Sequence, residues 1–169
     1  MPTVSNAAFA ALASGALLAT VVDIRVRRIP NALTATMAGI GLGFAASGMS
    51  GLSLGASILG FVIGFALMMP GHALGATGAG DVKFMAAVGA IVGPTLVVSA
   101  FLFTAIAGGV LAIAVAIRRK RLAATLAGTG RLISAPAGAK KEIEAATGSS
   151  RFAYGPAIAI GSVLAALIG

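Results

Sequence analysis

Long apolar runs dominate the chain, and short polar or glycine-rich stretches interrupt them. About 20 apolar residues are enough for a helix to cross the hydrocarbon of a membrane. The fold class predicted from this pattern is all-α, a polytopic transmembrane helix bundle. Six helices are expected, over Val4–Val22, Asn31–Ser47, Leu52–Met69, Val82–Gly93, Thr95–Ile117 and Phe152–Ile168.

Polar positions fall in the breaks between these runs, and charged positions fall in alternate breaks. Every Asp, Glu, Lys and Arg lies in or beside the first, third and fifth breaks, and the termini and the other breaks have none. If the chain changes sides at each helix, these three breaks share one side. Cytoplasmic loops are enriched in Lys and Arg. We therefore expect this side to be cytoplasmic, with the N-terminus and the C-terminus outside.

Composition excludes a soluble globular protein. Charged residues make up 9% of the chain and apolar residues 59%, whereas an ordinary soluble domain is about 25% charged. We predict one integral-membrane domain over residues 1–169, with a polar cytoplasmic loop at 118–151 and a short interfacial helix at Lys140–Ala146. The net charge of +8 follows from the charge asymmetry between the two sides, so membrane lipids are expected partners and nucleic acid is not.

The fourth run is short for a membrane span. Val82–Gly93 covers about 18 Å as a helix, against about 30 Å of hydrocarbon. The helix is either truly short or continues with a kink past Pro94, and we predict a break there because one straight helix would place the following basic cluster outside. Glycines at four-residue spacing favour close helix packing in lipid, and they occur as Gly39/Gly43, Gly51/Gly55, Gly60/Gly64 and Gly89/Gly93.

The sequence offers few residues for a metal site or for thiol chemistry. The chain has no cysteine and one histidine, His72. A disulfide framework, an iron–sulfur cluster and a thiolate zinc site are therefore excluded, and neither a metal nor a cofactor is expected. His72 is interpreted as an interfacial residue.

The carboxylates are few enough to single out two. Glu142 and Glu144 belong to the polar loop, so Asp23 and Asp81 are the acidic residues at the membrane. An ionisable group at membrane depth is costly and indicates a functional site. Two carboxylates that share a site repel, so one keeps a proton while the other is ionised, which is the arrangement of aspartic proteases. Alternatively, both aspartates pair with neighbouring cations and set only the topology.

Position along the helices predicts how two catalytic aspartates would divide the work. Asp81 lies near a helix N-terminus and should ionise more easily than Asp23, which lies near a helix C-terminus. We therefore expect Asp81 to be the base and Asp23 the acid. Gly78 and Gly80 lack a Cβ, which allows a sharp turn and the close approach of a substrate backbone.

Three segments together resemble the bacterial type IV prepilin peptidases, membrane aspartic proteases of the GxGD class. They are Gly78–Gly93, which begins Gly-Ala-Gly-Asp-Val-Lys, then Asp23 followed by Ile29-Pro30-Asn31, and Tyr154–Ala159. The resemblance implies that Asp23 and Asp81 are the catalytic pair. It also implies that the substrate is a pilin-like precursor, cleaved after a positively charged leader at the cytoplasmic face of the inner membrane.

Full-length members of that family also carry an insert with paired cysteines, which accompanies N-methylation of the new amino terminus. This chain has no cysteine and no room for the insert between Asp23 and the second helix. It therefore resembles the short, peptidase-only form found with tight-adherence (Flp-type) pili, and methyltransferase activity is not expected.

Pro30, Asn31 and Lys83 are predicted to support the site or to bind substrate. Lys83 either pairs with an acidic group, on Asp81 or on the precursor, or serves as a topology-setting charge. Asn31 is interpreted as the N-cap of the second helix. Two other functions remain open, a small transporter that uses both aspartates for a proton or a cation and a structural membrane subunit. A Ser–Lys dyad is discounted because no serine is predicted to lie near a lysine.

Overall fold

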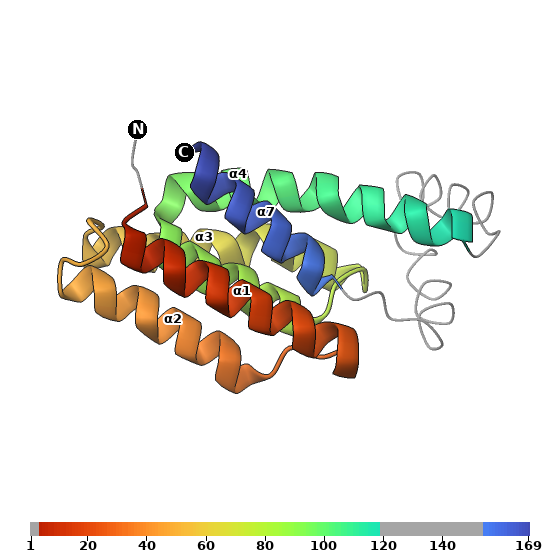
Figure 1. The fold of residues 1–169 in the computed structure, drawn as a ribbon, viewed down its shortest axis with the longest axis horizontal. Helices are drawn as coiled ribbons and strands as arrows, with labels where there is room; N and C mark the ends of the chain where they lie inside the picture. The colour runs from red at the N-terminus through yellow and green to blue at the C-terminus, as the bar shows by residue number, and fades with distance from the viewer. Residues whose placement is uncertain (1–3, 119–153) are drawn as a thin grey trace.

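The computed structural model describes residues 4–118 and 154–169, which form helices joined by short turns (Figure 1). The prediction of an all-α fold is confirmed for these residues. The loop predicted at 118–151, with its interfacial helix at Lys140–Ala146, lies outside them apart from Arg118. The helices are α1 (Asn6–Val26), α2 (Asn31–Ala46), α3 (Leu54–Ala73), α4 (Ala79–Arg118) and α7 (Gly155–Ile168).

Within the described residues, three helical stretches are long and apolar enough to cross a membrane. They are α1, α3 and the stretch Ala79–Ala114 of α4, while α2 and α7 are shorter apolar helices. The predicted count of six membrane crossings stays a prediction.

Several helices extend beyond the apolar runs that predicted them. α1 continues to Val26 rather than ending at Val22, so Asp23 lies inside its last turn. α3 continues through Pro70 to Ala73, beyond its predicted end at Met69. Hydropathy identifies the part of a helix that is apolar enough for hydrocarbon. The backbone hydrogen bonds of the helix can continue into polar sequence until a residue interrupts them.

The stretch α4 consists of two helical segments that meet at Gly93, where φ is 84° and ψ is 179°. The chain reverses there. The reversal is evident from the distance between the two segments, since a Cβ on Gly89 would lie only 3.1 Å from Cγ2 of Val97. In a straight helix, residues eight positions apart are separated by about 12 Å along the axis. Glycine adopts a positive φ without a steric penalty, and Pro94 has no N–H to continue the ladder. The predicted break at Gly93-Pro94 is confirmed.

Pro94 also removes the helical donor for one carbonyl. In an uninterrupted helix the N–H of residue 94 would donate to the carbonyl of Ala90, but proline has no N–H. The hydroxyl of Ser57 on α3 donates to this carbonyl instead, at 2.6 Å in a buried position. Because an unsatisfied backbone group in hydrocarbon costs several kcal/mol, this hydrogen bond lets α4 turn within the bundle.

The first segment of α4 forms the centre of the bundle. Helices α2, α3 and α7 pack on α4, and α1 packs mainly on α7. A helix that is apolar on all sides is typical of a protein interior, so this short segment is covered by protein and does not need to match the thickness of the bilayer. Its fully buried side chains include Phe84, Met85, Ala86, Ala87 and Val88.

Glycines allow α3 and α4 to approach closely. A Cβ on Gly60 would collide with the carbonyl of Gly89, and a Cβ on Gly64 would lie 2.5 Å from the carbonyl oxygen of Met85. The packing predicted for Gly60/Gly64 and for Gly89 is therefore present between these two helices.

The same prediction is wrong for the glycine pair on α2. Gly39 and Gly43 face open space within the described structure, whereas a Cβ on Gly41 would lie 2.8 Å from the backbone of Ala90. Four-residue spacing marks a face of a helix but does not say whether that face points inward. Gly51 lies in the turn before α3, with a φ of 73°.

Within the described residues, the charged side chains lie towards one end of the bundle. α1 ends and α4 begins at this end, whereas the α2–α3 turn, the reversal within α4 and the end of α7 lie at the other (Figure 1). The start of α1 is also at the uncharged end, near the end of α7. Which side of a membrane each end faces stays a prediction. Among residues 4–118 and 154–169, the charged residues are Asp23, Arg25, Arg27, Arg28, Asp81, Lys83 and Arg118.

Candidate active site

The start of α4 holds the side chain of Asp81 in place. Gly78 precedes the helix, and its carbonyl accepts the N–H of Asp81 at 3.1 Å. The Oδ2 of Asp81 in turn accepts the N–H of Gly78 at 2.8 Å. This is one half of a capping box, in which an acidic residue three positions into the helix bonds back to the N-cap. Asp81 thus lies at a helix N-terminus, as predicted, where the helix dipole favours a negative charge.

Asp23 meets a helix N-terminus as well. Its side chain is 5% exposed, and its Oδ2 accepts the backbone N–H of Gly155 at 2.8 Å. Gly155 is the first residue of α7, so the dipole of α7 acts on Asp23. Asp23 therefore lies between the C-terminal end of α1, on which its predicted role rests, and the N-terminal end of α7. Because both carboxylates meet the start of a helix, helix position does not separate their roles.

Two residues at the start of α7 belong to the site and were not predicted. A Cβ on Gly155 would lie 2.8 Å from Oδ2 of Asp23, so only glycine allows this contact without a shift. Tyr154 places its hydroxyl against Gly108 of α4, and burial, together with the charge of Asp81, raises the pKa of its phenol. The Tyr-Gly-Pro sequence near the start of the last apolar run was the available signal for both.

The segment between α1 and α2 packs against the start of α4. α1 stops at Arg27, which has a left-handed φ of 54° and donates its N–H to the carbonyl of Asp23. Two residues on, the buried Ile29 packs on Gly80, where a Cβ would lie 3.2 Å from that of Ile29. The close approach that Gly80 allows is therefore with the protein's own chain.

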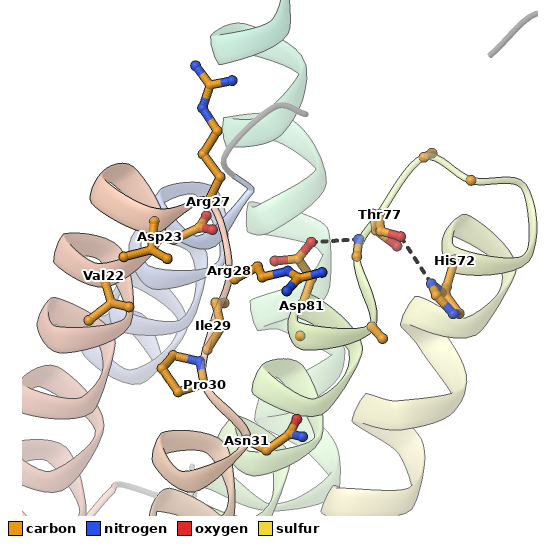
Figure 2. A pocket seen from close by; sticks show the side chains of 16 residues that line it. Val22, Asp23, Arg27, Arg28, Ile29, Pro30, Asn31, His72, Thr77 and Asp81 are labelled. Atoms are coloured by element: carbon orange, nitrogen blue, oxygen red, sulfur yellow. Dashed lines mark hydrogen bonds between the residues drawn. The ribbon is translucent and has the colours of Figure 1, made fainter. Parts of the chain in front are cut away.

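A pocket of about 920 Å³ lies between the end of α1, the α1–α2 segment, the end of α3 and the start of α4. Both carboxylates line it (Figure 2). Asp23 is 5% exposed and Asp81 is 8% exposed, so each is mostly enclosed by protein. The predicted residues Pro30, Asn31, Gly78 and Gly80 also line the pocket, whereas Lys83 does not. The remaining lining residues are Val22, Val26, Arg27, Arg28, Ile29, His72, Gly75, Ala76, Thr77 and Ala79.

Lys83 and Asn31 bond to each other. The Nζ of Lys83 donates to Oδ1 of Asn31 at 2.8 Å. Asn31 is the first residue of α2, and the N-cap position is occupied by Pro30, which makes no side-chain cap hydrogen bond. The interpretation of Asn31 as the N-cap is therefore wrong, because its side-chain oxygen accepts from α4 rather than from its own helix.

His72 lies in the last turn of α3 and lines the pocket. Its Nδ1 is 3.1 Å from the carbonyl oxygen of Thr77, and since a carbonyl can only accept, Nδ1 carries the proton. This hydrogen bond spans the loop that leads into α4 (Figure 2). Within residues 4–118 and 154–169, no group of three or more His, Asp or Glu residues is placed to hold a metal ion.

Comparison with known proteins identifies the family. The model of the type IV leader peptidase family matches residues 10–113, a range that contains both aspartates and every residue that lines the pocket. The chain belongs to the type IV leader peptidase family. The resemblance read from the sequence is thereby confirmed, and this leader peptidase is a protease. No curated protein and no solved structure matches the chain. The matched range ends before α7, which supplies the Gly155 contact to Asp23.

Proposed function

We propose that this leader peptidase is an aspartic endopeptidase that uses Asp23 and Asp81 to cleave the leader from a pilin-like precursor. One observation carries the proposal: two mostly buried carboxylates, on helices far apart in the chain, line the same pocket. Membership of the type IV leader peptidase family supplies the class of substrate.

The proposed reaction follows from the behaviour of paired carboxylates. One is ionised and the other protonated, because two negative charges in one site repel. The ionised group takes a proton from water as the water oxygen attacks the scissile carbonyl carbon, and the protonated group gives its proton to the carbonyl oxygen. When the tetrahedral intermediate collapses, the C–N bond breaks. The leaving nitrogen then takes a proton from the carboxylic acid formed in the first step, and the other carboxylate regains its proton from the intermediate.

The assignment of Asp81 as base and Asp23 as acid stays a prediction. Each carboxylate accepts a backbone N–H at the start of a helix, so this contact does not distinguish the two groups. Two carboxylates that share a site are treated as a coupled pair. Hydrolysis between two carboxylates requires neither a metal nor a cofactor.

We place the site at the cytoplasmic face of the bacterial inner membrane. The basic residues at the pocket end support this orientation, since Lys and Arg are retained on the cytoplasmic side. The absence of cysteine supports a peptidase-only form, of the kind found with tight-adherence (Flp-type) pili, without methyltransferase activity. Transport is less well supported, because transporter sites favour the bilayer midplane and these aspartates lie towards one end of the bundle.

Leader removal in cells tests the proposal. The chain is co-expressed with a tight-adherence pilin precursor, and the mass of the pilin is measured. We expect wild type to remove the leader, and Asp23→Asn or Asp81→Asn to lower the rate about 10³-fold or more, because neither variant can complete the pair. Ser14→Ala is the control, since this exposed hydroxyl bonds to carbonyls of its own helix. Wild-type processing by either Asn variant, at equal membrane abundance, would remove the proteolytic assignment.

A further inference from the structure

We propose that Lys83 and Asn31 form a clamp that holds the two aspartate-bearing segments in register, and that Lys83 is a positioning residue. This inference rests on the proposed function of Asp23 and Asp81. The bond between Nζ of Lys83 and Oδ1 of Asn31, 2.8 Å long, joins a residue two positions after one aspartate to a residue eight positions after the other. It therefore ties the continuation of α1 to the first turns of α4.

A second contact lies beside the first. Gly80 and Lys83 are three residues apart, so they lie on the same face of α4. Ile29, which is 7% exposed, packs on Gly80, and Asn31 reaches Lys83 on the exposed surface. The α1–α2 segment is thus attached to α4 at a buried apolar point and at an exposed polar point. The apolar contact excludes water but has no directionality, whereas the hydrogen bond fixes the register along α4.

The position of the α1–α2 segment along α4 matters for Asp23, because α1 itself packs mainly on α7 rather than on α4. Asp23 is consequently held by the N–H of Gly155 on one side and by the short segment that leads to α2 on the other. That segment is stiff, since it begins at the left-handed Arg27 and ends at Pro30, whose ring restricts φ. A shift of Asn31 would be passed back towards Asp23 rather than absorbed. Figure 2 shows this segment in view with both aspartates.

The position of Lys83 separates a clamp from substrate binding. Lys83 does not line the pocket, whereas Asn31 does. The partner of Lys83 is the neutral amide oxygen of Asn31, so the contact requires a hydrogen-bond donor on a side chain long enough to reach it. A group that aligns reacting carboxylates acts mainly on the chemical step, because small displacements of reacting groups have large effects on rate.

The kinetics of matched variants test the clamp. Lys83→Met keeps the stem and loses the donor, Asn31→Leu keeps the size and loses the acceptor, and Asn31→Asp keeps an acceptor. With a precursor peptide and the full chain in detergent, we expect the first two variants to lower kcat on the order of tenfold, with KM within twofold of wild type. Asn31→Asp should be faster than Asn31→Leu because it keeps an acceptor for Lys83, and the double variant Lys83→Met/Asn31→Leu should be no slower than either single variant.

Arg25→Met is the control for charge, because Arg25 is an exposed cation near Asp23 that does not line the pocket. It should keep the wild-type kcat. A rise in KM without a fall in kcat in Lys83→Met would overturn the clamp in favour of substrate binding. Additive losses in the double variant, or an Asn31→Asp variant as slow as Asn31→Leu, would also overturn it.

A readout without catalysis keeps the clamp testable if wild type fails to cleave the peptide. The chain has no cysteine, so Ile29→Cys and Gly80→Cys introduce a single pair at a contact close enough for a disulfide. Adding Lys83→Met should slow oxidative cross-linking of this pair severalfold, and adding Arg25→Met should not. Equal cross-linking rates would overturn the clamp, whereas failure of wild type to cleave would count against the proposed function alone.

Discussion

Single residues position the two carboxylates through backbone N–H groups. Gly78 donates to Asp81 across three positions of sequence, and Gly155 donates to Asp23 across 132 positions. Both donors are glycines at the start of a helix. Gly78 directly precedes α4, and Gly155 is the first residue of α7. Such a donor is rigid, because it belongs to the helix backbone and has no rotamers to order. Both aspartates are therefore oriented before any substrate arrives.

Gly155→Ala should slow leader removal strongly. The added Cβ would lie 2.8 Å from Oδ2 and 3.0 Å from Cβ of Asp23, so α1 or the Asp23 side chain must shift. We expect the rate of leader removal to fall about 100-fold, as measured by mass spectrometry of the precursor peptide. Gly109→Ala is the control, since a Cβ there meets nothing within 4 Å. A Gly155→Ala enzyme with the wild-type rate would show that this contact does not orient Asp23.

At the scale of elements, the reversal within α4 decides which helices can reach the site. It sends the second segment back towards the pocket end, where Gly108 meets Tyr154. The reversal requires a glycine at 93 for its positive φ and a proline at 94 that ends the ladder. The hydroxyl of Ser57 supports it, because it donates to the carbonyl of Ala90, to which Pro94 cannot donate.

Ser57→Ala should destabilise the bundle. The variant leaves the buried carbonyl of Ala90 without its donor, and a lost buried hydrogen bond of this kind costs about 1–3 kcal/mol. The free energy of unfolding, measured by reversible denaturation in mixed detergent micelles, is expected to fall by that amount. Ser47→Ala provides the comparison, because its hydroxyl is exposed and bonds to a carbonyl in its own helix. Equal stabilities of the two variants would contradict this role for Ser57.

For the whole molecule, the separation of charged and uncharged ends among the described residues predicts its orientation in the membrane. The described charged residues lie towards the pocket end, so moving that end to the outer face would carry arginines across the bilayer. Transfer of Arg or Lys into hydrocarbon costs about 2.5–3.5 kcal/mol per residue. The pocket should therefore open towards the cytoplasm, where the precursor leader is made.

Single cysteines at the two ends test this orientation. Met49 in the α2–α3 turn is 55% exposed and Leu74 after α3 is 38% exposed, and the chain has no cysteine of its own. In spheroplasts, a membrane-impermeant maleimide should label Met49→Cys at once. It should label Leu74→Cys only after the membrane is permeabilised. The reverse order would place the pocket outside and contradict a cytoplasmic site.

Much of the fold and half of the site could be predicted from local sequence. Apolar runs identified the helices because lipid selects for uninterrupted hydrophobic stretches. The break at Gly93-Pro94 was predictable because both residues act on their own backbone. Asp23 and Asp81 were identified because so few acidic residues occur outside the polar loop. The Gly78 contact with Asp81 is equally local.

Only the tertiary structure decided which partners these residues meet. Gly155 beside Asp23, Asn31 beside Lys83 and Ser57 beside Ala90 are each separated by 33 residues or more in the chain. Nothing in the local pattern predicts such pairs. The helices are also apolar on every face, because lipid accepts the same side chains as the protein interior. Sequence therefore determined where the chain is helical and which acids are available, whereas packing decided which faces turn inward and which N–H groups meet the carboxylates.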